Sequence, residues 1–162
     1  MLSVLPSLLA LGLAALAALA LALNRRSPAD RGPQRRAASR VLALAVAIQG
    51  IHFAEETATG FHARFGPLFG VPAMPLSLFV IFNLAWLGIW VTSVAGLRSA
   101  RTIAFFAAWF LAIAGTLNGL AHPLLAVAVG GYFPGLWSSP VIGAASVWLW
   151  LRLRTATRPG AL

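Results

Sequence analysis

The chain has 162 residues, of which 60% are hydrophobic and only 9% charged, and its formal net charge is +9. A soluble domain carries about 25% charged residues, so this composition, with a mean hydropathy of +0.87, excludes a water-soluble protein and predicts an all-α polytopic transmembrane bundle. The absence of cysteine and lysine excludes disulfides, thiolate nucleophiles, Cys-ligated metal clusters, Schiff bases and Walker-type phosphate loops.

Hydropathy divides the chain into five apolar segments of roughly membrane-spanning length, which together form a single transmembrane domain over 1–162. The segments are expected at about 2–23, 41–59, 75–97, 102–129 and 139–153, with a polar, arginine-rich loop at 24–40. The fifth segment is short for a span. Ser139 and Pro140 favour a helix start there, and a re-entrant segment is the alternative.

The basic residues are all arginine, and they alternate with these segments. Six lie in the loop 24–40, two at 98–101 and three in the C-terminal tail, which leaves Arg64 alone on the opposite side. Because cytoplasmic loops are enriched in arginine, this distribution predicts five crossings, an N-terminus outside and a C-terminus in the cytoplasm.

We expect the protein in a plasma membrane, and the bias towards alanine, leucine and arginine is typical of a bacterial genome. Membrane lipids, not nucleic acid, are the expected partners of the arginines.

Acidic residues occur at an unexpected depth in the second segment. Glu55 and Glu56 are two of the three acidic residues of the chain, and they lie near the outer end of the segment in IQGIHFAEET. In a helix, His52 shares their face and Gln49 lies one turn further in. Counted from residue 41 at about 1.5 Å per residue, these side chains sit roughly 16 to 23 Å into a ~30 Å core. Ionisable groups at that depth predict a functional site.

A second polar stripe lies on the fourth segment. Asn118 and His122 share a face with Gly115 and Gly119, whose missing side chains predict a closely packed neighbouring helix. Pro123 cannot donate a backbone hydrogen bond, so the helix is expected to kink or break beside His122.

The third segment carries Asn83, about 12 Å below the outer boundary, and Trp86 and Trp90 continue its face. Three segments therefore bring polar side chains to one depth.

The motif residues form an ordered pattern along the chain. They are His52-Phe-Ala-Glu55-Glu56, then Asn118-x-x-x-His122, then Tyr132-Phe-Pro134-Gly135. This pattern resembles the signature of the HXXEE family of integral membrane proteins. The resemblance covers most of the chain from the second segment onward, whereas the first segment and the basic loop lie outside it. It implies an enzyme that uses these positions, and it leaves the reaction open.

Two adjacent carboxylates in a low-dielectric environment need a proton or a compensating cation. A divalent metal satisfies that need, because His52 and His122 with Glu55 or Glu56 form a set of two histidines and one carboxylate suited to zinc or iron. The other glutamate is then expected to act as a general base or to support a ligand.

The expected activity is metal-assisted hydrolysis or oxidation of a lipid-soluble substrate, with Asn118, Asn83 and Tyr132 orienting or polarising it beside the glutamates. Metal-free acid–base isomerisation is the alternative chemistry, for which the architecture is similar to five-helix sterol isomerases of the emopamil-binding type. A proton or metal-ion transporter and a non-catalytic membrane assembly protein are the alternatives outside enzymology. A Ser-His-Asp triad is disfavoured, because the single aspartate lies on the cytoplasmic side, away from Ser138.

The same residues can also have purely structural roles. The glutamates can lie solvated at the outer interface, His122 can cap a helix at the headgroup level, and the asparagines can join helices by hydrogen bonds. Tyr132 fits an interfacial aromatic belt. His62 and Arg64, in the outer loop, are expected to be solvated.

Overall fold

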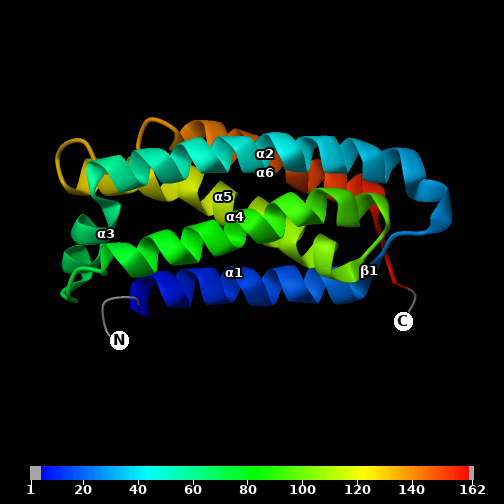
Figure 1. Cartoon of the computed structure of the whole chain (residues 1–162), viewed down its shortest axis with the longest axis horizontal. Coiled ribbons are helices and arrows are strands. Elements are labelled where there is room, and N and C mark those ends of the chain that lie inside the picture. The colour runs from blue at the N-terminus through cyan, green and yellow to red at the C-terminus, as the bar shows by residue number, and fades with distance from the viewer. Residues whose placement is uncertain (1–4, 161–162) are drawn as a thin grey trace.

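The computed structural model describes residues 5–160, which form an elongated bundle of helices (Figure 1). The α-helices are α1 (Leu5–Asn24), α2 (Gly32–Thr59), α3 (Phe61–Arg64), α4 (Leu76–Arg98), α5 (Thr102–Ala128) and α6 (Ser139–Ala156). Short 3-10 turns occur at η2 (Ala29–Arg31) and η3 (Gly66–Phe69), and the two-residue strands β1 (Arg25–Arg26) and β2 (Arg158–Pro159) pair antiparallel. The predicted all-α class is confirmed.

Three helical segments are long and apolar enough to cross a membrane, which supports a membrane protein. They are Ala29–Thr59, Leu76–Arg98 and Thr102–Ala128. Helix α1 contributes a shorter apolar stretch, Leu9–Asn24, and with α6 it runs alongside these three (Figure 1).

One local expectation was wrong. Helix α2 begins at Gly32 inside the segment expected to be a loop, because Pro33 suits the first helical turn and the following arginines and alanines are good helix formers. Of the kink or break expected beside His122, the break does not occur, because α5 continues through Pro123 to Ala128. Packing against its neighbours holds the helix together there, as occurs in other membrane helices that contain proline.

Helix α5 is the centre of the bundle, since α1, α4 and α6 all pack on it, while α2 packs on α4 and α6. Its side chains from Phe105 to Ala112 are almost all buried. The glycine face predicted on α5 meets α6 as expected: a Cβ on Gly119 would lie only 2.7 Å from the Cα of Gly143. This close approach fixes where α6, and the loop that precedes it, sit against the C-terminal part of α5.

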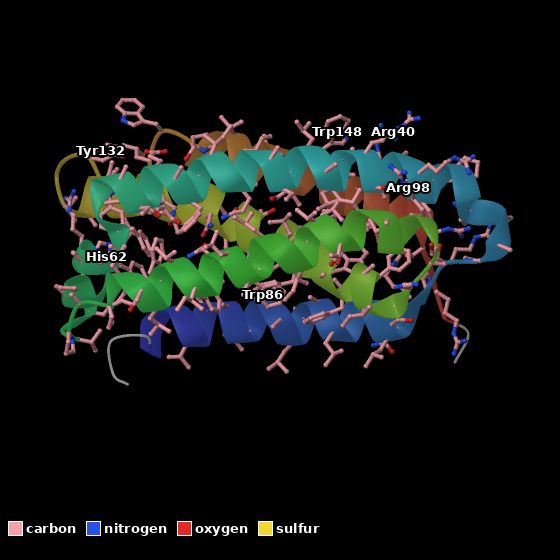
Figure 2. All side chains as sticks on the ribbon, viewed as in Figure 1. Arg40, His62, Trp86, Arg98, Tyr132 and Trp148 are labelled. Atoms are coloured by element: carbon pink, nitrogen blue, oxygen red, sulfur yellow. The ribbon has the colours of Figure 1, made fainter. Side chains whose placement is uncertain are left out.

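The arginine-rich segments gather at one end of the bundle. Arg25 donates to Thr157 Oγ1 at 2.8 Å, and Arg98 donates to Ser39 Oγ at 2.9 Å. Figure 2 shows Arg40 and Arg98 towards this end, and His62 and Tyr132 at the opposite end. The charge asymmetry predicted from the sequence is therefore an asymmetry between the two ends of the fold.

Candidate metal centre

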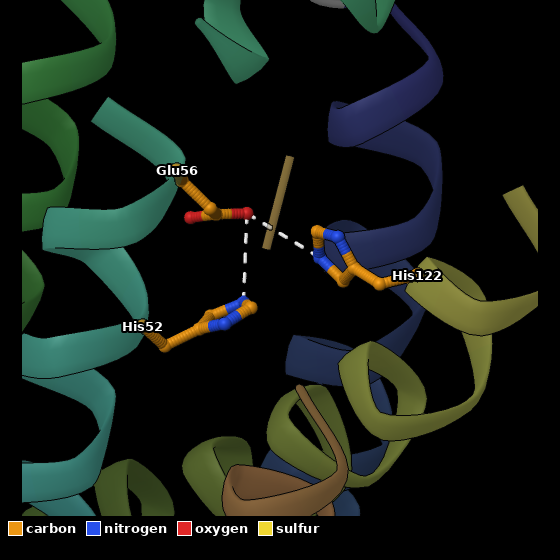
Figure 3. A group of neighbouring side chains, drawn as sticks. All are labelled: His52, Glu56 and His122. Atoms are coloured by element: carbon orange, nitrogen blue, oxygen red, sulfur yellow. Dashed lines mark ion pairs between the residues drawn. The ribbon is translucent and has the colours of Figure 1, made fainter. Parts of the chain in front are cut away.

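His52, Glu56 and His122 converge inside the end of the bundle opposite the arginines (Figure 3). His52 and Glu56 lie one turn apart on α2, and His122 comes from α5. Glu56 Oε1 lies 3.5 Å from His52 Nε2 and 3.4 Å from His122 Nε2. All three residues are buried, and their candidate ligand atoms lie within 4.8 Å of one another. We call this set the trio.

The other ring nitrogen of each histidine is held by an oxygen. His122 Nδ1 lies 2.6 Å from the carbonyl oxygen of Pro134, which can only accept, so the proton sits on Nδ1. His52 Nδ1 lies 2.8 Å from Ser138 Oγ. Because that hydroxyl donates its own proton to Glu55, it accepts from His52 Nδ1. Nε2 of each histidine therefore faces Glu56, and in the neutral form of the ring that nitrogen offers a lone pair to it.

A carboxylate oxygen and a nitrogen lone pair that point at each other repel, so this arrangement needs a proton or a cation between Glu56 and the histidines. The two distances from Glu56 Oε1 fit a cation, whereas the two histidine nitrogens are only bounded to within 4.8 Å of each other. For metal–ligand bonds of about 2.0–2.1 Å, the edge of a tetrahedron is roughly 3.3–3.4 Å, close to the two separations measured from Glu56. Metal-binding histidines also typically donate their second ring N–H to an oxygen, as both do here. The donor set suits zinc or iron.

Glu55 is turned away from the trio and holds the loop between α5 and α6. Its carboxylate accepts from Tyr132 Oη at 2.7 Å, from the backbone N–H of Trp137 at 3.0 Å and of Ser138 at 2.8 Å, and from the hydroxyl of Ser138. The sequence placed both glutamates among the candidate metal ligands and catalytic groups. The geometry separates them, with Glu56 facing the histidines and Glu55 occupied by four donors.

The loop's tight turn lies directly over the histidine rings. Gly135 has φ +87°, a conformation that glycine adopts without strain, and a Cβ there would lie 2.6 Å from His122 Cε1 and 2.9 Å from His52 Cε1. Phe133 is fully buried beside His122, with ring centroids 6.1 Å apart, and Phe61 of α3 packs on both. The Tyr-Phe-Pro-Gly sequence thus forms the cover of the trio.

Tyr132 and Arg64 complete this cover. Partial burial and the hydrogen bond to Glu55 raise the pKa of the Tyr132 hydroxyl above its ordinary value, so it stays a neutral donor. Arg64 donates to the carbonyl oxygen of Tyr132 at 3.1 Å and lies over the Phe133 ring. Arg64 was expected to be solvated. It remains exposed, but it also stabilises the loop between α5 and α6 through its hydrogen bond to Tyr132.

The two asparagines lie at different places. Asn118 Nδ2 is 3.4 Å from His52 Nε2, at the edge of the trio. Asn83 donates to the carbonyl oxygen of Phe79 in its own helix at 2.9 Å and lines the cavity beside the trio without contacting it. Asn118 is therefore the nearer candidate for orienting a substrate.

Sequence reasoning missed Ser138. A catalytic triad at Ser138 was disfavoured because the only aspartate is remote. The acid that contacts Ser138 is instead Glu55, which is 83 residues away in the chain. The hydrogen-bonded chain runs from the Glu55 carboxylate through the Ser138 hydroxyl to His52, and the hydroxyl donates to Glu55. Ser138 therefore orients His52, and the arrangement is not that of a serine nucleophile, which requires the histidine to accept the hydroxyl proton.

No family model matches the chain, and neither a curated protein nor a solved structure matches it. The resemblance to the HXXEE family therefore rests on the motif residues alone.

Proposed function

We propose that this protein is a membrane-embedded metalloenzyme that hydrolyses or oxidises a lipid-soluble substrate at the trio. The observation that carries the proposal is that Nε2 of both histidines faces Glu56, while Nδ1 of each ring contacts an oxygen that fixes its orientation. A structural role for two buried histidines would not require Nε2 of both rings to face one carboxylate.

In this function His52, Glu56 and His122 hold one zinc or iron ion. A zinc ion would supply Lewis acidity and activate a water for hydrolysis, and an iron ion would supply a redox centre through which an external oxidant such as dioxygen acts. Glu55 and Ser138 hold the ring of His52, and the Pro134 carbonyl holds that of His122. Phe133 and Phe61 restrict water at this end, and the amide of Asn118 orients a polar group of the substrate.

The proposal includes the membrane topology expected from the sequence. All five long helices cross the bilayer, the arginine end faces the cytoplasm, and the trio lies in the outer half. It also includes membership of the HXXEE family. The arrangement of the loops supports this topology, because the α1–α2 and α4–α5 connections and the residues after α6 share one end (Figure 1).

Metal-free acid–base isomerisation is the second candidate function. It is favoured by one observation: both Glu56 and His122 line an apolar cavity, so a proton could pass between them and a substrate there. A proton transporter has less support. Among the described residues, the buried polar side chains outside the trio are serines, a threonine and a glutamine, which do not ionise along a path towards the arginine end.

The test is turnover of lipid extracts by purified protein, followed by mass spectrometry of the products. We expect activity in the wild type, loss after chelation with recovery on adding zinc or iron, and loss in Glu56→Gln. His62→Ala is the matched control, because His62 lies at the same end of the bundle but outside the trio. Activity that survives chelation but not Glu56→Gln would favour the isomerase, and activity that survives both would refute the proposed site.

A further inference from the structure

A single elongated cavity connects the trio to the interior of the bundle. It has a volume of about 310 Å³, and its walls come from α1, α2, α4 and α5. Glu56, Asn118 and His122 lie at its outer end, and Trp86, Trp90 and Phe110 lie at its inner end. Apart from those outer groups, Gln49 and Asn83 are the polar side chains among the described residues that line it.

The inner end is a closed aromatic floor. Trp86 and Phe110 have ring centroids 4.3 Å apart, and Trp90 packs on the same pair. The indole N–H of Trp90 donates to the carbonyl oxygen of Ala107 at 2.9 Å, so it offers no polar contact to a ligand. The floor therefore accepts the apolar end of a molecule.

The dimensions of the cavity limit what it can hold. His122 and Phe110 are twelve residues apart on α5, which at about 1.5 Å per residue gives a length of ~18 Å. At about 1.25 Å of advance per carbon, from C–C bonds of about 1.5 Å, that length fits roughly 14 carbons. The volume gives a second estimate: a cavity of about 150 Å³ holds one benzene, so about 310 Å³ holds on the order of 12 carbons. The two estimates agree on the size of one chain, and the volume leaves no room for a second.

Two observations indicate that the cavity opens sideways between α1 and α4. Helix α1 packs on α5 and makes little contact with α4, although Leu11 of α1 lines the same cavity. On the α4 side, Leu78 and Phe82 also line the cavity, and their exposures are 45% and 39%. An opening bordered by exposed apolar side chains faces lipid in a membrane, so a ligand can enter from the bilayer without crossing water.

The outer end selects the head of the ligand. Glu56 and His122 face the cavity, and the proposed metal needs a further ligand, for which an oxygen is suitable. The Asn118 amide can hydrogen-bond to the same head group. A carboxyl, ester or hydroxyl group at the end of a chain meets these requirements.

Resting on the proposed metal site, we propose that the substrate is a single-chain lipid of about 12 to 14 carbons with an oxygen-bearing head. It enters between α1 and α4, places its head at the trio and lays its chain against Trp86 and Trp90.

The probe for this proposal is a series of fatty acids with bromine on the terminal carbon, added to the protein in lipid nanodiscs. Bromine quenches tryptophan fluorescence on contact, and the terminal bromine of a bound dodecanoic acid reaches the floor. We expect a saturable quenching phase on top of the linear quenching of lipid-exposed tryptophans. Its half-saturation should be lowest for bromododecanoic acid and about tenfold higher for the octanoic and octadecanoic analogues.

Three variants test the location. Ala114→Phe places a ring inside the cavity and should abolish the saturable phase, whereas Ala85→Phe, at an exposed position on the same stretch of the bundle but outside the cavity, should keep it. Should Ala114→Phe fail to fold, Trp86→Phe with Trp90→Phe removes the two fluorophores at the floor. That double variant should lose the saturable phase and retain the linear one.

Metal content, measured on the same preparations, separates this proposal from the metalloenzyme proposal. Saturable quenching in protein without metal would uphold the lipid cavity and refute the metal function. Bound metal without saturable quenching, or a saturable phase that persists in Ala114→Phe and in the double tryptophan variant, would overturn the cavity proposal alone.

Discussion

Replacing Glu55 with glutamine should release the loop over the trio without changing the size of the side chain. One carboxylate oxygen becomes an amide nitrogen. The remaining oxygen can keep the two hydrogen bonds from the hydroxyl and the N–H of Ser138. The new amide nitrogen then faces the other two donors. The hydroxyl of Tyr132 can turn to accept from it, whereas the N–H of Trp137 loses its acceptor. The substitution therefore removes one hydrogen bond and the negative charge from the other three.

The size of the effect follows from these contacts. A hydrogen bond to a charged group contributes about 1.5–3 kcal/mol and a neutral one about 1 kcal/mol. Weakening three bonds by about 1 kcal/mol each lowers the stability of the loop by about 3 kcal/mol or more, since the lost bond of Trp137 adds to this sum. At about 1.4 kcal/mol per factor of ten, the open form of the loop becomes roughly 100-fold more populated.

Hydrogen exchange measures this directly. We expect the amides of Trp137 and Ser138 to exchange about 100-fold faster in Glu55→Gln, while amides in the middle of α5 keep their protection. Asp30→Asn is the matched control, because it makes the same chemical change in an exposed carboxylate that pairs with Arg158 at the opposite end. Unchanged exchange at residues 137 and 138 would show that Glu55 does not hold the loop, and the assigned division between the glutamates would fail.

Two glycine substitutions test the packing around the trio. Gly135→Ala combines a positive φ with a Cβ 2.6 Å from His122, so it should lower stability by about 2–4 kcal/mol and reduce metal content; wild-type melting and metal content would contradict the close cover. Gly119→Ala should cost about 1–3 kcal/mol because its Cβ meets the backbone of Gly143, whereas Gly88→Ala, which has nothing within 4 Å, should melt like the wild type; equal melting temperatures for the two variants would refute the tight α5–α6 contact.

The helices could be predicted from the sequence because the information is local. Apolar runs, the arginines between them, and Pro140 at the start of α6 place the segments to within a few residues, apart from the start of α2 and the start of the first segment, which lies outside the described residues. The start of α2 at Gly32 was missed because arginine is both a marker of loops and a good helix former. Hydropathy alone cannot separate these two uses.

The site could be predicted in part. The i, i+4 spacing of His52 and Glu56 places both on one face of α2, and the depth of His122 matches theirs. The sequence could not distinguish Glu56 from Glu55, because adjacent residues point about 100° apart and the rotation of α2 depends on packing against α4 and α6. Ser138 was missed for a related reason. Its partners come from α2, far away in the chain, so no local pattern identifies it.

The most direct test of the account is the metal content of purified protein that has never met a chelator, measured by elemental mass spectrometry. We predict near-stoichiometric zinc or iron in the wild type, its loss in Glu56→Gln and His122→Ala, and its substantial retention in Glu55→Gln, since Glu55 supports a ligand and does not face the trio. Wild-type protein free of metal, or metal that depends on Glu55 and not on Glu56, would contradict the assignment of the trio.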